Sequence, residues 1–254
     1  MTTSHGLKLD WLSPNKGEHP ILLNNQIHLW CVPLKLTHSQ ESIAIDLLSD
    51  IQRDKYHRRS NKLKANYLAG RYFLLNLLAQ YTSTEADKIQ LSYSRLNKPF
   101  LSNKSDNKLQ FNFSDTVIDD VCYGVFAFCK EHEIGVDIES KEREIDFKPI
   151  AERRFSEPEL NYVTLENGEI DHQRCIAIWT RKEAFGKACG KGINFKMNEL
   201  NLLENNSFEL NFHALNKDWR LQQIEIDQNL VCSVVHQHHQ VLDIKAFNSL
   251  NHIP

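Results

Sequence analysis

Two carboxylates stand one residue apart in the segment Glu133–Ser140, whose sequence is EIGVDIES. The segment is typical of a buried strand, and side chains alternate between the two faces of a strand. Asp137 and Glu139 therefore share one face, while Val136 and Ile138 share the other. Carboxylate oxygens are the ligands that Mg²⁺ prefers, and a cation would relieve the repulsion between the like charges. The alternative is a strand face on which both carboxylates are simply hydrated.

A third carboxylate lies on a predicted helix that contains the sequence WTRKEAFGKACGKG, residues 179–192. Glu183 and Lys187 are four residues apart, so they share one side of that helix, roughly opposite Phe185. Two carboxylates from a strand and a third from a helix would suit a magnesium ion. The alternative is a hydrated Glu–Lys pair, which is common on helix surfaces and contributes only about 0.3 kcal/mol.

A basic stretch upstream predicts an anion site. Its cations are Arg53, Lys55, Arg58, Arg59, Lys62, Lys64 and Arg71, and the only acid among them is Asp54. Such a stretch can bind phosphate or an acidic partner, or it can be a hydrated helix face with its connecting turn. Nucleic acid is disfavoured as a partner because no aromatic interleaving and no nucleic-acid motif accompanies the charges.

Three smaller signatures carry polar or cationic groups. The sequence NKPF, residues 97–100, predicts a turn into a strand with Lys98 at the bend. The sequence FNFSD, residues 111–115, predicts a strand end with side chains that can bond a phosphate or cap a turn. The histidines of residues 236–239 have no acidic or cysteine partner nearby, so we expect a strand end or loop there rather than a metal site.

The elements that must position these residues are helices and strands in mixed order, which predicts an α+β fold. Helices are predicted at Glu41–Asp50, at Leu63–Tyr81, after the capping box of Ser156–Glu159, and from Asp171 to Gly190. Strands are predicted at Ile27–Pro33, Ile89–Tyr93, Leu109–Phe113, Val121–Cys129, Ile134–Glu139, Leu200–Leu203, Phe208–Phe212, Trp219–Ile226, Leu230–Val235 and Val241–Phe247. The order predicts two α+β halves that join near residues 115–125.

Composition narrows the class of protein. The 254 residues carry a net charge of only −3, so any basic site must be local. The longest near-apolar run, residues 121–129, is far shorter than the roughly 18–20 residues of a membrane helix. No secretory signal is visible at the N-terminus, and the six cysteines form no CxxC pair. We therefore expect a soluble protein of the reducing cytoplasm.

Taken together and in this order, NKPF, FNFS, GVDIES and WTRKEAFGKACGKG resemble the 4′-phosphopantetheinyl transferases of the two-lobed Sfp type. The resemblance covers roughly residues 45–205. It implies a pseudodimer of two related α+β lobes, which we expect at residues 1–118 and 119–254, with coenzyme A bound between them. It also implies the reaction, in which the phosphopantetheine arm of coenzyme A moves to a serine of an apo carrier protein and 3′,5′-ADP is released.

The resemblance assigns roles to individual residues. Asp137 and Glu183 match family Mg²⁺ ligands, and Glu139 matches the third acidic position. Lys187 matches the lysine that contacts the phosphates. Residues expected to bind coenzyme A are Lys98 and Pro99 at the adenine nucleotide, Asn112 and Ser114 at the strand end beside it, and Lys55 and Arg53 at the 3′-phosphate.

The implied chemistry agrees with physical expectation. In phosphoryl-group transfer the protein mainly positions the reactants and offsets developing charge. Asp137, Glu183 and Lys187 are the expected catalytic residues, with Glu183 as the acceptor of the carrier serine proton, directly or through a metal-bound water. The expected partners are coenzyme A and an acidic apo acyl or peptidyl carrier protein, with no nucleic acid or membrane, and the protein is expected to be a monomer. Fatty-acid, polyketide, polyunsaturated-lipid, peptide-synthetase and lysine-pathway carriers all remain open.

The chain departs from the family pattern at Asp115, where the family usually has histidine after the serine. An aspartate offers a phosphate no positive charge. This departure motivates an alternative, a catalytically impaired homologue that binds coenzyme A or a carrier protein. A further alternative is an unrelated Mg²⁺-dependent nucleotide hydrolase.

Overall fold

The computed structural model describes residues 6–15, 18–102, 108–192, 196–203, 208–237 and 242–248. Its helices are α1 (His38–Asp46), α2 (Asp50–His57), α3 (Asn61–Thr82), α4 (Lys148–Arg154), α5 (Glu157–Val163) and α6 (His172–Ala188), with short 3₁₀ turns η1 (Ala86–Lys88) and η3 (Met197–Glu199). Its strands are β1 (Leu7–Lys8), β2 (Trp11–Leu12), β3 (Gln26–Pro33), β4 (Leu91–Tyr93), β5 (Pro99–Leu101), β6 (Leu109–Ile118), β7 (Val121–Lys130), β8 (Ile134–Ser140), β9 (Glu209–Ala214), β10 (Lys217–Glu225), β11 (Leu230–His236) and β12 (Asp243–Phe247). The predicted α+β class is confirmed.

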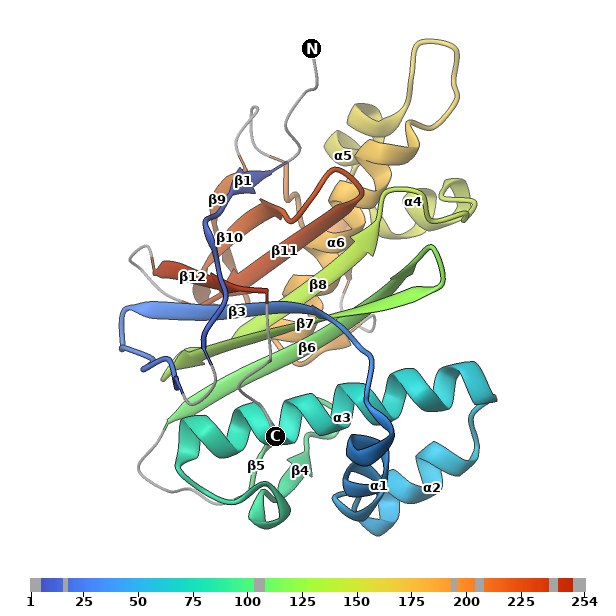
Figure 1. The fold of residues 1–254 in the computed structure, drawn as a ribbon. Coiled ribbons are helices and arrows are strands. Elements are labelled where there is room, and N and C mark those ends of the chain that lie inside the picture. The colour runs from blue at the N-terminus through green and yellow to red at the C-terminus, as the bar shows by residue number, and fades with distance from the viewer. Residues whose placement is uncertain are drawn as a thin grey trace.

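Two mixed sheets form the centre of the molecule (Figure 1). One has the strand order β1-β10-β11-β8, with β9 also paired to β10, on the edge opposite β11. The other has the order β2-β12-β3-β7-β6, and a separate hairpin is formed by β4 and β5. Each large sheet has its own long helix, α3 or α6, which gives two lobes of similar construction (Figure 1).

The helix α3 covers the sheet that contains β6 and β7. Leu68, Tyr72, Leu75 and Leu78 recur at helical spacing and are all buried, as the sequence predicts. Tyr72 belongs to an apolar cluster that also contains Trp30, Phe126 and Phe128 of the sheet. The helix therefore exists because one face of it has an apolar sheet to pack against.

The helix α6 packs in the same way on the sheet that contains β8 and β11. It begins after Asp171, whose side chain accepts a hydrogen bond from the Arg174 amide at 3.0 Å. The predicted N-cap is confirmed, as is the capping box of Ser156 and Glu159 at the start of α5. Phe185 of α6 packs among buried residues of β10 and β11, including Trp219 and Val235.

The two sheets share one apolar core. Leu29 and Ala127 from the α3-bearing sheet lie in the same buried cluster as Val136, Ile138 and Val234 from the α6-bearing sheet. The proposed division at 118/119 falls between β6 and β7, which pair along their whole lengths. Strands from both sides of that position thus share a sheet, and the limits of the lobes stay a prediction.

Three sequence predictions of elements are wrong. The segment Glu41–Asp50 was predicted as one helix but contains the end of α1 and the start of α2, because Ser49 caps a new helix through the Gln52 amide. The strand predicted to end near residue 113 continues to Ile118, where β-branched residues favour extension. Leu200–Leu203 is not a strand. Its Leu202 amide donates to the Glu159 carboxylate at 2.8 Å instead of to a neighbouring strand.

No helix in the described part of the chain is both long and apolar enough to cross a membrane.

A buried histidine in β3 makes the stability depend on pH. The Tyr81 hydroxyl accepts a hydrogen bond from the Trp30 indole at 2.9 Å, so its own proton can be donated to His28 Nδ1 at 2.7 Å, which favours a neutral imidazole. Burial, and secondarily the Lys245 charge, lowers the pKa of His28 to about 4. Between about pH 6.5 and pH 4 the unfolded chain binds a proton that the folded protein refuses, so the folded state loses up to about 3 kcal/mol as the pH falls.

We expect His28→Gln to remove this part of the pH dependence, since Gln is neutral and can still accept the tyrosine proton. Urea unfolding at pH 7 and pH 5 measures the change for each protein. His38→Gln is the matched control, because the His38 side chain is fully exposed. An equal loss between the two pH values in wild type and His28→Gln would contradict the assignment.

Candidate active site

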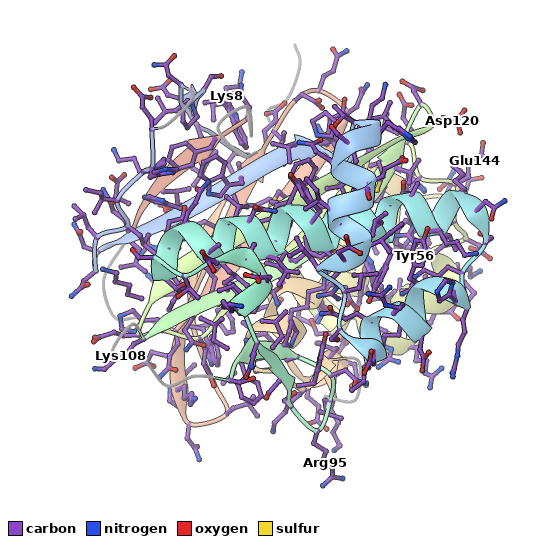
Figure 2. The ribbon with its side chains drawn as sticks, turned by 60° about the horizontal axis from the view of Figure 1, so that its bottom comes forward. Lys8, Tyr56, Arg95, Lys108, Asp120 and Glu144 are labelled. Carbon is purple, nitrogen blue, oxygen red and sulfur yellow. The ribbon has the colours of Figure 1, made fainter. Side chains whose placement is uncertain are left out.

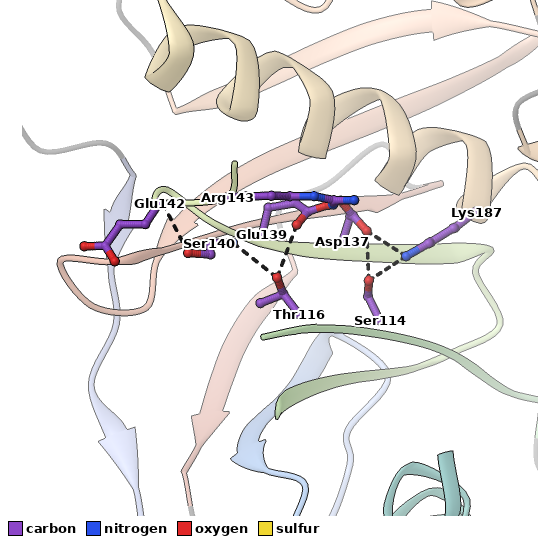
Figure 3. A network of polar contacts seen from close by, with 8 residues as sticks. All are labelled: Ser114, Thr116, Asp137, Glu139, Ser140, Glu142, Arg143 and Lys187. Carbon is purple, nitrogen blue, oxygen red and sulfur yellow. Dashed lines mark hydrogen bonds and ion pairs between the residues drawn. The ribbon is translucent and has the colours of Figure 1, made fainter. Parts of the chain in front are cut away.

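Strands β6 and β8 lie beside each other and are joined by side chains (Figure 3). The amide of Val136 donates to the side-chain oxygen of Asn112 at 3.0 Å, and the amide of Ser140 donates to the Thr116 hydroxyl at 3.3 Å. Asn112, Ser114 and Thr116 occupy every second position of β6 and so share one of its faces, the face that meets β8. Since β6 belongs to one sheet and β8 to the other, this seam is where the two lobes meet.

Asp137 lies at the centre of the seam. It is buried, at 5% exposure, and its Oδ1 accepts hydrogen bonds from the Ser114 hydroxyl at 2.8 Å and the Lys187 ammonium at 2.7 Å. Lys187 also donates to the Ser114 oxygen at 2.6 Å (Figure 3). The second carboxylate oxygen, Oδ2, is buried with no hydrogen-bond partner in the described part of the protein. A buried carboxylate oxygen without a partner costs free energy, so it is suited to receive a ligand.

Glu139 is buried beside it, on the same face of β8. Its carboxylate pairs with Arg143 and accepts the Thr116 hydroxyl at 3.2 Å. Burial, followed by the negative charge of Asp137, raises the pKa of Glu139 to about 7, although Arg143 opposes the shift. The prediction that the two carboxylates share a face is confirmed, but both are buried rather than hydrated.

Glu183 approaches the same site from α6, one turn before Lys187. It is half-buried, and among the described residues its carboxylate makes no hydrogen bond or ion pair. Burial raises its pKa, and so does the charge of Asp137, while Lys187 opposes the shift. The structure therefore places Glu183 and Lys187 of the helix α6 near Asp137 of the adjacent strand β8.

Of the residues predicted to hold coenzyme A, Lys98, Pro99 and Arg53 lie outside the seam, and the two cations among them already donate to backbone carbonyls. Lys98 donates to the carbonyls of Ile134 at 3.1 Å and Ala188 at 2.6 Å, and Pro99 begins β5. Arg53 donates to the Ile45 carbonyl at 3.1 Å, near the end of α1.

The other coenzyme A residues differ in what they contact. Lys55 lies over the Tyr93 ring at 4.9 Å. Asn112 and Ser114 are buried and bonded to β8, so in this conformation they serve the seam. None of these contacts tests coenzyme A binding, which stays a prediction.

Three other cations of the basic stretch, Arg59, Lys64 and Arg71, lie on tyrosine rings around α2 and α3, while Lys62 pairs with Asp120 at 2.7 Å. Arg59 lies 4.2 Å and Arg71 lies 5.3 Å from the centre of the Tyr67 ring. Asp115, the departure from the family pattern, is exposed and points away from the face that carries Ser114. The Cys122 thiol donates to its carboxylate at 3.6 Å.

Comparison with known proteins adds what geometry alone leaves open. A family model described as the 4′-phosphopantetheinyl transferase superfamily matches residues 133–235, which include β8 and α6. The chain is also 27% identical, over 232 residues, to the protein named 4′-phosphopantetheinyl transferase HetI of Nostoc sp., and this match covers 90% of the chain and 94% of HetI. The chain is thus similar to this superfamily over residues 133–235, and to one named 4′-phosphopantetheinyl transferase over nearly its whole length.

Two further phosphopantetheinyl transferases match over a smaller part of the chain. The L-aminoadipate-semialdehyde dehydrogenase-phosphopantetheinyl transferase of Mus musculus is 31% identical over 52% of the chain and 45% of the mouse protein. The 4′-phosphopantetheinyl transferase gsp of Aneurinibacillus migulanus is 30% identical over 52% of the chain and 51% of gsp. The chain thus matches about half the length of these two relatives.

Sequence reasoning missed several residues that build this candidate site. Thr116 and Arg143 hold Glu139, and no local pattern marks either of them. Lys182, in the middle of the helix motif, forms a buried ion pair with Glu159 at 2.7 Å. Its ammonium also donates to the Met197 and Leu200 carbonyls, at 2.6 and 2.7 Å. Lys182 could have been found from the sequence, because it stands next to Glu183 on the side of the helix that faces the core.

Proposed function

We propose that the protein transfers the 4′-phosphopantetheine moiety of coenzyme A to a serine of an apo acyl or peptidyl carrier protein and releases 3′,5′-ADP. The match of residues 133–235 to the superfamily model supports the reaction. Two relatives that the chain matches, over 94% and 51% of their own lengths, are named as 4′-phosphopantetheinyl transferases. The observation that carries the proposal is the buried Asp137 at the seam of the two lobes. It has one oxygen bonded to Lys187 and the other without a partner.

The carboxylates fit a hard cation by their chemistry. Asp137 offers its Oδ2, which has no hydrogen-bond partner among the described residues. Burial, and after it the Asp137 charge, raises the pKa of both Glu139 and Glu183, so like charges are crowded there. Among the described residues no group of three or more histidine, cysteine, aspartate or glutamate side chains lies close enough together to hold a metal ion. Glu139 bonds Arg143 and Thr116 in this conformation, so the three carboxylates do not converge.

Because carboxylates are suited to a hard cation, Mg²⁺ is part of the proposal. Asp137, Glu139 and Glu183 are the residues that would hold it. When bound, it would offset negative charge on the pyrophosphate. Removal of divalent cations by a chelator is a direct check on this part of the proposal.

Lys187 and Glu183 would perform two different steps. The side chain of Lys187 is 28% exposed, so its ammonium can turn from Asp137 toward the phosphate that leaves with 3′,5′-ADP and offset its charge. Glu183 has a raised pKa, which makes its carboxylate a better base near neutral pH. It would accept the proton of the carrier serine as the serine oxygen bonds to the pantetheine-side phosphorus and the bond from that phosphorus to 3′,5′-ADP breaks.

The test is direct. We expect an apo carrier protein incubated with this protein, coenzyme A and Mg²⁺ to gain the mass of one phosphopantetheine group, as measured by intact mass spectrometry. Omission of coenzyme A is the control. No gain on a panel of carriers, with coenzyme A binding retained in calorimetry, would leave the impaired binding homologue as the better explanation. Hydrolysis of coenzyme A without a carrier would favour the nucleotide hydrolase.

The carrier itself is a further part of the proposal. Acyl carriers of fatty-acid or polyketide synthesis and peptidyl carriers of peptide synthetases are all tested by the same panel. Carrier domains are acidic, so the cations around α2 and α3 are the expected docking charge. All six cysteines are free thiols, which suits the reducing cytoplasm in which we propose that the reaction occurs.

A further inference from the structure

Lys98 joins three elements that are far apart in the sequence. It lies in the turn of the hairpin formed by β4 and β5, outside both large sheets. Its Nζ donates to the carbonyl of Ala188 at 2.6 Å and to the carbonyl of Ile134 at 3.1 Å. Ala188 is the last residue of α6 and Ile134 is the first residue of β8. One ammonium therefore ties the hairpin to the ends of the helix and the strand that carry the site.

The contact is physically strong for a surface turn. The last carbonyls of a helix have no partner within the helix and carry the negative end of its dipole, so a cation is favourable there. Hydrogen bonds that involve a charged group are stronger than neutral ones, more so when water is excluded. Burial lowers the pKa of Lys98, and the Glu133 carboxylate opposes that shift.

The chain that leaves α6 also packs on the stem of this lysine. Gly190 has a φ of +66°, and a Cβ built on it would lie 3.5 Å from Cδ of Lys98. The backbone N–H groups of Cys189 and Gly190 close the helix by donating hydrogen bonds to the carbonyls of Phe185 at 2.9 Å and Lys187 at 3.3 Å. The end of α6 is therefore built around the lysine as well as bonded to it.

The two carbonyls stand next to the two halves of the central ion pair. Ala188 directly follows Lys187, and Ile134 lies three residues before Asp137 on the same strand. Nζ of Lys187 and Oδ1 of Asp137 are 2.7 Å apart. Any separation of the end of α6 from the start of β8 would move these two charges relative to each other, and Lys98 bonds to both sides of that gap.

We propose that Lys98 is a positioning residue. Its ammonium holds the end of α6 against the start of β8, so that Lys187 and Glu183 face Asp137, and it does not bind the substrate. The inference rests on the proposed function for its catalytic readout, but its structural readout does not. It replaces the expectation that the Lys98 side chain contacts coenzyme A.

Lys98→Met separates the two roles, because it keeps most of the stem and removes the charge. We expect kcat to fall about 10- to 100-fold through misplacement of Lys187, with KM for coenzyme A changed less than about threefold. In the protein without substrate, we expect faster hydrogen exchange of amides at residues 185–190. A raised KM with unchanged kcat and unchanged exchange would overturn the proposal in favour of substrate binding.

Arg95→Met is the matched control, because Arg95 is an exposed cation in the same turn and projects from the tip of the hairpin (Figure 2). We expect exchange at residues 185–190 to stay as in the wild type. Lys98→Arg keeps a cationic donor, and recovery of both kcat and exchange protection supports positioning. If Lys98→Met does not fold, a folded Lys98→Arg with normal protection but low kcat overturns the proposal.

The exchange measurement also keeps the two hypotheses apart. A wild-type protein that transfers nothing to any carrier would count against the proposed function. Faster exchange at the end of α6 in Lys98→Met would still show that Lys98 holds α6 against β8. Unchanged exchange would contradict that role.

Discussion

Replacement of Asp137 by Asn is expected to lower the rate of phosphopantetheine transfer by at least about 10²–10³-fold, the usual effect of removing one group that stabilises charge in a transition state. Asn has nearly the shape of Asp and can still accept hydrogen bonds from Ser114 and Lys187, whose contacts now use Oδ1. It lacks the negative charge, and its NH₂ group takes the place of an oxygen that has no partner. The loss should therefore fall on cation binding and on the orientation of Lys187.

Two measurements check this expectation. Initial rates of mass gain on the carrier give the transfer activity, and calorimetric titration with Mg²⁺ gives the binding of the cation. Thermal melting should change little, because the Lys187 side chain is partly exposed and can be hydrated once its partner is neutral. A variant that transfers within about threefold of wild type and still binds Mg²⁺ would remove Asp137 from the site.

Glu142→Gln is the matched control for Asp137→Asn. Its carboxylate lies just beyond the end of β8, is exposed, and points away from the network of Asp137 (Figure 3). The same neutralisation of a carboxylate at that position should leave both transfer and cation binding unchanged.

Local patterns predicted the parts of the fold that depend on neighbours in sequence. The alternation of Val136, Asp137, Ile138 and Glu139 gave the correct faces of β8, since the period of a strand is fixed by backbone geometry. The Asp171 cap is likewise a contact over three residues. The split between α1 and α2 could have been predicted from the same kind of signal, because the capping box of Ser49 and Gln52 is local.

Long-range contacts could not be predicted in this way. The family resemblance placed Lys98 at the adenine nucleotide, which stays a prediction. The hydrogen bonds that the Lys98 ammonium makes in the structure reach carbonyls 36 and 90 residues away in the sequence. Thr116 bonds Glu139 across the seam for the same reason, and only the three-dimensional approach of β6 to β8 brings them together. The C-terminal strand β12 pairs in parallel with β3 near the other end of the chain, which no local period encodes.

Gly135→Ala is expected to destabilise the protein by at least about 3 kcal/mol, at the upper end of the usual cost of overpacking. A Cβ built on Gly135 would lie 2.1 Å from the Ala184 carbonyl oxygen and 2.3 Å from the Ala188 amide nitrogen. Both are backbone atoms of α6, so no side chain can turn aside to make room. The helix would have to move away from β8, which would open the apolar packing of Phe185 behind it. Urea unfolding followed by circular dichroism measures the loss.

Gly168→Ala separates this contact from the general cost of replacing a glycine. Gly168 has a φ of +81°, and no atom of the described residues lies within 4 Å of its built Cβ, so its replacement should cost only the left-handed backbone penalty of about 1–2 kcal/mol. If Gly135→Ala were no more destabilising than Gly168→Ala, α6 could shift on β8 at little cost. The distances from Glu183 and Lys187 to Asp137 could then vary, and the hydrogen bonds of Lys98 would do little to fix the position of α6 on β8. A large loss of stability in Gly135→Ala alone would instead mean that α6 can approach β8 this closely only because residue 135 has no side chain. That close approach brings the proposed base, Glu183, to the proposed metal ligand, Asp137.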